Sequence, residues 1–291
     1  MIQRTRSRLP YEQGQRYMDY LEACRKAYKA AEPDEPRFAA LARDYWANGY
    51  CTFMPARGTE LAQSMRARVA TLAESVGTQA WRDDRFYGGD TYRDFPEVRE
   101  LLAGDLGKLY RAIYRAHFKI FYGMIFRSIR DADTPIYSQL WHADGGPGTC
   151  VIAIFALSDI GAHNGGTEML PWPQSVEVMR AERRAAKALD AEAKALGPNP
   201  DRMALRDVKC RFYERTIAAE YTSRVVRASG PPGTLLCFSN NVIHRGGYPE
   251  PGQIREVALL HAYPSMTPTP FETYAARGVE KVAGNPAGPD F

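Results

Sequence analysis

The sequence predicts a mainly β protein with α-helices: an antiparallel, cupin-like jelly roll with a helical N-terminal part and a helical insert. Three observations lead to this prediction. Helical patterns dominate the first 117 residues. From residue 118 on, short runs of β-branched and aromatic residues follow one another, bounded by Gly, Pro, Asn and Asp. One charged, alanine-rich block interrupts these runs, which are otherwise typical of an antiparallel jelly roll.

Helices are expected first along the chain, at residues 11–31 and 37–47. In the second of them Phe38, Leu41 and Tyr45 recur at helical spacing and form an apolar stripe that must pack against another element. The further elements expected up to residue 117 are a strand at 50–54, a helix at 59–75, a turn-rich surface loop at 83–95 and a helix at 96–117.

The strands of the jelly roll are expected in the second half of the chain. They are the segments 118–129, 136–141, 150–157, 166–170, 223–228, 234–238 and 255–263. The interrupting block, 175–196, has Ala186, Leu189 and Ala193 at spacings of three and four, so it is expected to be an amphipathic helix. Such a helix either decorates the surface or forms a lid over a site.

We expect a single domain over residues 1–291, because one core can be built from a chain of this length. Its parts would be a mostly helical segment 1–117, a jelly-roll core 118–263 with a helical insert at 175–222, and a Gly/Pro-rich tail at 264–291.

Composition and charge argue against several classes of protein. The formal net charge of +4 is too small to indicate a nucleic-acid partner, and no apolar run is long enough for a transmembrane helix. The basic N-terminus has no apolar segment behind it, which argues against a secretory signal. The five cysteines include no Cys-X-X-Cys pair, so reduced thiols and a cytoplasmic location are expected.

His142 and Asp144 are the strongest candidates for a functional site. In an extended strand, side chains two residues apart point to the same side, so this pair would present an imidazole and a carboxylate together. His244, between a strand-like run and Gly246-Gly247, could complete the set from a distant part of the chain. Two histidines and one carboxylate form the facial triad that holds non-haem Fe(II) and leaves positions open for a co-substrate and O₂.

Arg255 and Gln139 are the candidate co-substrate ligands. Arg255 lies eleven residues after His244 at the start of the last predicted strand, and a guanidinium can bind a carboxylate through two parallel hydrogen bonds. Gln139 precedes His142 by three residues. It could bind the co-substrate, orient a metal ligand, or satisfy the backbone of its own strand.

The sequence resembles the Fe(II)/2-oxoglutarate-dependent dioxygenases of the phytanoyl-CoA dioxygenase family. The resemblance rests on His142-Ala143-Asp144, on the segments 164–171 and 232–238, on His244-Arg245-Gly246-Gly247, and on Arg255. It implies a double-stranded β-helix with N-terminal helices packed on one sheet. It also implies that His142, Asp144 and His244 bind iron and that Arg255 binds the distal carboxylate of 2-oxoglutarate. It also implies that a C–H bond of a small organic substrate is hydroxylated or otherwise oxidised, with succinate and CO₂ as co-products.

Some features depart from this family. Pro171-Trp172-Pro173-Gln174-Ser175 stands where the family commonly has Pro-Gly-Ser-His, and the long helical block follows it. His261 stands where the nucleic-acid demethylases of the superfamily have a second arginine, which argues against a DNA or RNA substrate. The carboxylate at 144 favours hydroxylation, or another oxidation such as desaturation or ring formation, because related halogenases have Gly or Ala at that position.

Two other readings stay open at this point. One is a cupin-type metalloenzyme that does not use 2-oxoglutarate, and the other is a non-enzymatic jelly-roll binding domain. The substrate is expected to be a small molecule. It would be anionic if the insert arginines Arg180, Arg183 and Arg184 face the site.

Overall fold

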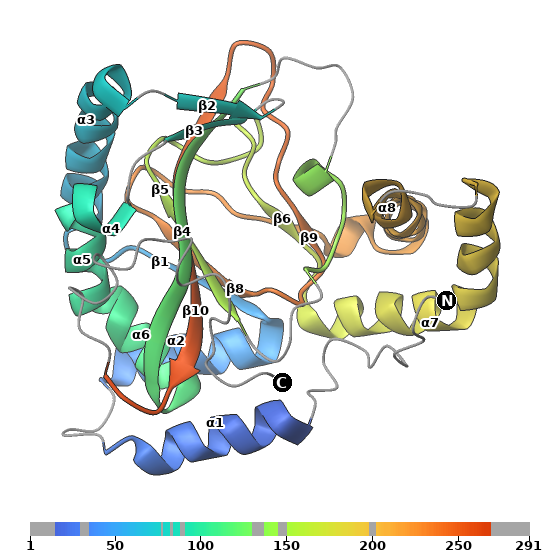
Figure 1. The fold of residues 1–291 in the computed structure, drawn as a ribbon, viewed down its shortest axis with the longest axis horizontal. Helices are drawn as coiled ribbons and strands as arrows, with labels where there is room; N and C mark the ends of the chain where they lie inside the picture. Colours follow the sequence, from blue (N-terminus) through green and yellow to red (C-terminus); the bar gives the residue numbers. More distant parts are fainter. Residues whose placement is uncertain are drawn as a thin grey trace.

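The computed structural model describes residues 15–29, 35–76, 78–81, 84–87, 91–129, 137–144, 150–197 and 202–268. Within these ranges the protein combines α-helices with two antiparallel sheets (Figure 1). The larger sheet has the order β1-β8-β5-β10-β4-β3-β2, and the smaller one has the order β7-β6-β9. The strands are β1 (Tyr50–Phe53), β2 (Thr78–Trp81), β3 (Asp84–Tyr87), β4 (His117–Ile129), β5 (Val151–Ala156), β6 (Glu168–Met169), β7 (Val226–Arg227), β8 (Leu235–Ser239), β9 (His244–Arg245) and β10 (Ile254–Ser265).

The N-terminal helices lie against the larger sheet. They are α1 (Gln15–Ala27), α2 (Pro36–Asn48), α3 (Gly58–Val76), α4 (Thr91–Asp94), α5 (Pro96–Ala103) and α6 (Asp105–Tyr114). Helix α6 contacts β4 and α1 contacts β10, and their apolar side chains join the sheet residues in one core. Tyr114 fixes α6 to the sheet, because its hydroxyl donates to the carbonyl of Ala262 at 2.6 Å and accepts from the amide of Val151 at 2.9 Å. The prediction of helices packed on one sheet is confirmed.

Gly49 ends α2 as the sequence predicts. It has a φ of 81°, and its amide donates to the carbonyl of Tyr45 at 2.7 Å. A Cβ added to Gly49 would lie 2.3 Å from a methyl group of Val242, so only glycine permits this close approach. The end of α2 therefore packs directly on the segment that leads to His244.

The structure corrects three predictions. The helix expected at 96–117 is two helices, because Gly104, with a φ of −92° and a ψ of −134°, breaks it between α5 and α6. His117 begins β4 instead of ending a helix. The loop expected at 83–95 contains β3, which pairs with β4, and the short helix α4.

The predicted insert is a pair of helices, α7 (Trp172–Ala195) and α8 (Arg202–Glu220). They lie beside β6 and β9 of the smaller sheet, away from the N-terminal helices α3, α5 and α6 (Figure 1). The helices contribute Val178, Met179, Tyr213 and Ile217 to a second apolar cluster, which also contains Trp141, Leu170 and Ile243. None of the helices in the described ranges is long and apolar enough to cross a bilayer.

Candidate metal centre

The site is built where two distant segments pair. His142 and His244 form an antiparallel bridge, in which the amide of each donates to the carbonyl of the other at 2.9 and 2.8 Å. Residues that are directly opposite in such a pair project to the same face. The two imidazoles accordingly lie side by side, with ring centroids 4.4 Å apart.

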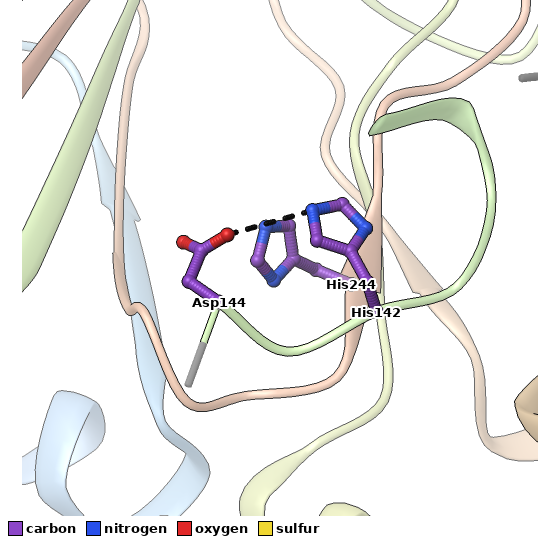
Figure 2. Close-up of side chains that lie close together, drawn as sticks. All are labelled: His142, Asp144 and His244. Atoms are coloured by element: carbon purple, nitrogen blue, oxygen red, sulfur yellow. Dashed lines mark ion pairs between the residues drawn. The ribbon is translucent and has the colours of Figure 1, made fainter. Parts of the chain in front are cut away.

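Asp144 completes the cluster. Its amide donates to the carbonyl of Asn240 at 2.9 Å, which ties the chain two residues beyond His142 to the segment that leads to His244. An oxygen of its carboxylate lies 3.6 Å from Nε2 of His142. One ligand atom from each of His142, Asp144 and His244 lies within 4.8 Å of the other two, and the side chains converge from neighbouring backbone segments (Figure 2).

The local conformation before His142 differs from the predicted strand. Residues Tyr137–Gln139 form a short 3-10 helix, η1, where part of a strand at 136–141 was expected, and residue 136 lies outside the described residues. The expected relation between His142 and Asp144 holds all the same, because their ligand atoms lie in one cluster, with a carboxylate oxygen of Asp144 3.6 Å from Nε2 of His142.

Both histidines are oriented by their own chain. Nδ1 of His142 lies 2.7 Å from the carbonyl oxygen of Leu140, and Nδ1 of His244 lies 2.8 Å from that of Val242. A carbonyl can only accept, so each Nδ1 carries a proton, and Nε2 is the nitrogen through which each ring can bind a metal. Histidines that bind a metal through one ring nitrogen usually donate a hydrogen bond from the other, as Nδ1 does here.

Burial favours the neutral form of His142. His142 and His244 are each 6% exposed, whereas Asp144 is on the solvent side of the cluster. Burial, followed by the nearby imidazole of His244, lowers the pKa of His142 to about 3 even though Asp144 acts in the opposite direction. Burial also lowers the pKa of His261, on β10 near Asp144 and His244, to about 4. A neutral imidazole is the form that binds a metal.

Arg255 lies on β10 and points into the fold, with 5% of its surface exposed. Its Nη1 donates to the carbonyl of Gly165 at 3.0 Å, and its guanidinium carbon is 5.5 Å from the centre of the Phe126 ring. A Cβ added to Gly246 would lie 3.3 Å from Nη1 of Arg255. The guanidinium thus lies beside the backbone two residues after His244. Arg255 and the segment of His244, both predicted site positions, are therefore close in space.

Gln139 is buried in η1, at 8% exposure, on the same segment as His142. The carbonyl of its neighbour Ser138 accepts from the amide of Gly246 at 2.7 Å, so η1 is joined to the segment that lies on Arg255. Arg180, Arg183 and Arg184 of α7 are all exposed.

Charged residues beneath the site were not predicted. Glu168 is buried between Arg245 and Arg227, and Arg245 also reaches Glu214 of α8. Burial raises the pKa of Glu168, but the two guanidinium groups outweigh it, and the net shift is downward. The sequence could have placed Arg245 near the site, because it is next to His244. It could not have singled out Glu214, which stands in a helix with many other charged residues.

The donor set fits a ferrous ion. Two imidazoles and a carboxylate on one face, open on the carboxylate side, are the ligands of non-haem iron oxygenases. Two of the three groups are buried imidazoles, and buried polar groups lose solvation unless they gain partners, so their convergence is a mark of a functional site.

No family model matches the sequence, and no curated protein matches it. Solved structures do share its fold. The epimerase SnoN in complex with Fe³⁺, alpha ketoglutarate and nogalamycin RO is 13% identical, with 78% of this chain and 84% of that chain covered and a TM-score of 0.53. The non-heme alpha ketoglutarate dependent carbocyclase SnoK is 16% identical over 77% of this chain and 82% of that chain, with a TM-score of 0.51.

EctD from S. alaskensis with bound Fe is also 16% identical, over 81% of this chain and 79% of that chain, with a TM-score of 0.51. At these identities the likeness concerns the fold. The chain has the mixed helix and antiparallel-sheet fold of non-haem iron, 2-oxoglutarate-dependent enzymes.

Proposed function

We propose that this protein is an Fe(II)- and 2-oxoglutarate-dependent oxygenase that hydroxylates a C–H bond of a small organic substrate. The observation that carries the proposal is the convergence of His142, Asp144 and His244 on one face, with both Nδ1 atoms bonded to carbonyl groups. The shared fold of the solved iron enzymes supports it. We assign the whole chain to one domain of this kind, built on a double-stranded β-helix.

In this proposal Nε2 of His142, Nε2 of His244 and the carboxylate of Asp144 hold the iron. Bound there, Fe(II) with 2-oxoglutarate and O₂ supplies an oxidant for unactivated C–H bonds, and succinate and CO₂ are released. The resemblance to the phytanoyl-CoA dioxygenase family in particular rests on the sequence motifs alone.

Arg255 would bind the distal carboxylate of 2-oxoglutarate. Its guanidinium is buried, and one nitrogen is already held by the carbonyl of Gly165, so its plane is fixed before the co-substrate arrives. A fixed guanidinium loses less conformational entropy when it binds a carboxylate. Gln139, on the segment joined to Gly246, is proposed as a second polar contact.

The protein would also keep water away from the reaction. His244 is packed edge-on against the ring of Phe238, whose centroid is 4.7 Å away. The strand register places Phe238, Ile152 and His261 on one face of the larger sheet. Apolar side chains such as Phe238 and Ile152 lower the dielectric constant near His244. Electrostatic interactions at the proposed metal site would be stronger as a result.

The test is 2-oxoglutarate turnover with anaerobically loaded Fe(II), started by O₂ and measured as succinate released, across a library of small metabolites. A true substrate should raise succinate release and gain the mass of one oxygen atom. Loss of two hydrogens or an unchanged mass would point to desaturation, cyclisation or epimerisation. No iron-dependent succinate under any condition would contradict the proposal, and would favour a cupin-type metalloenzyme or a binding domain, neither of which gives Arg255 a task.

A further inference from the structure

Each helix of the insert contributes one polar side chain that accepts a hydrogen bond from the backbone amide of the residue before a site histidine. The carboxylate of Glu214 on α8 accepts a hydrogen bond from the amide of Trp141 at 3.1 Å. The hydroxyl of Ser175 on α7 accepts one from the amide of Ile243 at 3.0 Å, and itself donates to the carbonyl of Leu170 at 2.5 Å. Trp141 precedes His142, and Ile243 precedes His244.

The side chains of the same two residues anchor in the insert. Trp141 and Ile243 are 2% and 0% exposed and belong to the apolar cluster formed with α7 and α8. In an extended segment their side chains point to the side opposite that of His142 and His244. The insert therefore supports the site from behind, whereas a lid would cover the face toward which the ligands point.

Arg245 links the two histidine segments through the same carboxylate. Its Nη1 lies 3.3 Å from Glu214, its Nε donates to Glu168 of β6 at 2.6 Å, and its guanidinium carbon is 4.7 Å from the centre of the Trp141 ring. Glu214 thus contacts both the residue before His142 and the residue after His244. One carboxylate of the insert fixes the distance between two chains that are far apart in the sequence.

We propose that α7 and α8 position the two histidines for metal binding, and that Glu214 and Ser175 are the positioning residues through which they do so. This inference rests on the proposed function, because it concerns the metal site assigned there. Glu214 and Ser175 touch neither substrate nor ligand atoms. They act by holding the amides of Trp141 and Ile243, so that the histidine rings meet at the spacing that a metal requires.

The experiment measures binding of Co(II), as a spectroscopic substitute for Fe(II), to the metal-free protein and its variants. Glu214→Ala removes both contacts of the carboxylate, while Glu214→Gln keeps an acceptor for the Trp141 amide and loses the charge that faces Arg245. The matched control is Glu220→Gln, an exposed glutamate at the end of the same helix. Ser175→Ala is paired with Ser223→Ala, an exposed serine.

We expect Glu214→Ala and Ser175→Ala to weaken Co(II) binding by about 10-fold or more, as the loss of groups that support metal ligands typically does. Glu214→Gln should fall between Glu214→Ala and the wild-type protein. The visible absorption bands of bound Co(II), which report ligand geometry, should change in these variants and stay as in the wild type in Glu220→Gln and Ser223→Ala.

The outcomes separate the two proposals. If the wild-type protein binds no Co(II), the metal site itself is wrong. If it binds Co(II), and Glu214→Gln and Ser175→Ala bind it with unchanged affinity and spectrum, the positioning role is wrong while the metal site stands. Thermal unfolding of each metal-free variant shows whether it is folded, and Glu214→Gln, which is nearly the same size and shape, serves if Glu214→Ala does not fold.

Discussion

The guanidinium of Arg255 lies against Gly246, two residues beyond His244, so close that a Cβ on Gly246 would be 3.3 Å from Nη1. This contact joins β10 to the strand that carries a site histidine. The proposed role of Arg255 in binding the co-substrate depends on this closeness to the segment of His244.

Replacing Arg255 with Gln or Lys should weaken the use of 2-oxoglutarate. Removing one partner of a buried charged pair typically costs about 2 kcal/mol or more, which corresponds to about a 30-fold higher KM for 2-oxoglutarate. Lysine keeps the charge but loses the planar pair of donors, so it should rescue only part of the affinity. Arg43→Gln, an exposed change on α2, is the control, and equal KM values in Arg255→Gln and Arg43→Gln would contradict the role.

Replacing Asp144 with Ala should abolish iron-dependent turnover. The carboxylate is one of three groups that meet at the site, so its loss should cost more than the 10–100-fold typical of groups that only support a ligand. Succinate release is the measurement. The control is Asp159→Ala, an exposed aspartate, and turnover that survives in Asp144→Ala would show that the carboxylate is not a ligand.

The metal-free protein should lose stability as the pH falls below 6.5. Burial lowers the pKa of His142 to about 3 and that of His261 to about 4, so the unfolded chain binds protons in this range while the folded protein does not. The stabilisation is complete above pH 6.5 and is lost toward the folded pKa values. Each histidine should lower the free energy of unfolding by up to about 1.4 kcal/mol per pH unit.

Urea unfolding at about pH 7, 6 and 5 measures this dependence. His142→Gln and His261→Gln should each remove part of the slope, because each removes one group that titrates only when unfolded. A free energy of unfolding that is constant or rises between pH 6.5 and 5 would mean that the histidines are protonated in the folded protein.

Gly233 and Gly252 form a matched pair for testing how the turn before β8 packs on α3. Both have a positive φ, of 95° and 79°. A Cβ at Gly233 would lie 2.2 Å from the carbonyl carbon of Gly58, whereas one at Gly252 would meet no atom within 4 Å. Gly252→Ala should therefore cost about 1–2 kcal/mol for its backbone conformation alone, and Gly233→Ala clearly more. Equal losses in urea unfolding would contradict the close packing of this turn.

Part of the candidate site could be expected from the sequence, because that part of its geometry is local. His142 and Asp144 are two residues apart, so they face the same way if the chain between them is extended. His244 follows one strand, and Arg255 lies at the start of another. What the sequence could not give is the pairing of His142 with His244, which is set by contacts between segments about a hundred residues apart.

Other features escaped prediction for physical reasons. Helix α8 carries charged residues on most of its surface, so its buried Val208, Tyr213 and Ile217 give a weak periodic signal. Strand β3 lies in a polar stretch, and its place is fixed by pairing with β4 more than by its own residues. Glu214 and Ser175 have no sequence signature, because their partners are backbone amides.

The proposed iron site is tested by anaerobic titration of the metal-free protein with Fe(II), followed by 2-oxoglutarate. One iron should bind per chain, and the addition of 2-oxoglutarate should produce a visible charge-transfer band. That band should be absent in Asp144→Ala and should need much more 2-oxoglutarate in Arg255→Gln. Failure of the wild-type protein to bind iron, or a band that forms equally well in Asp144→Ala, would contradict the proposed site.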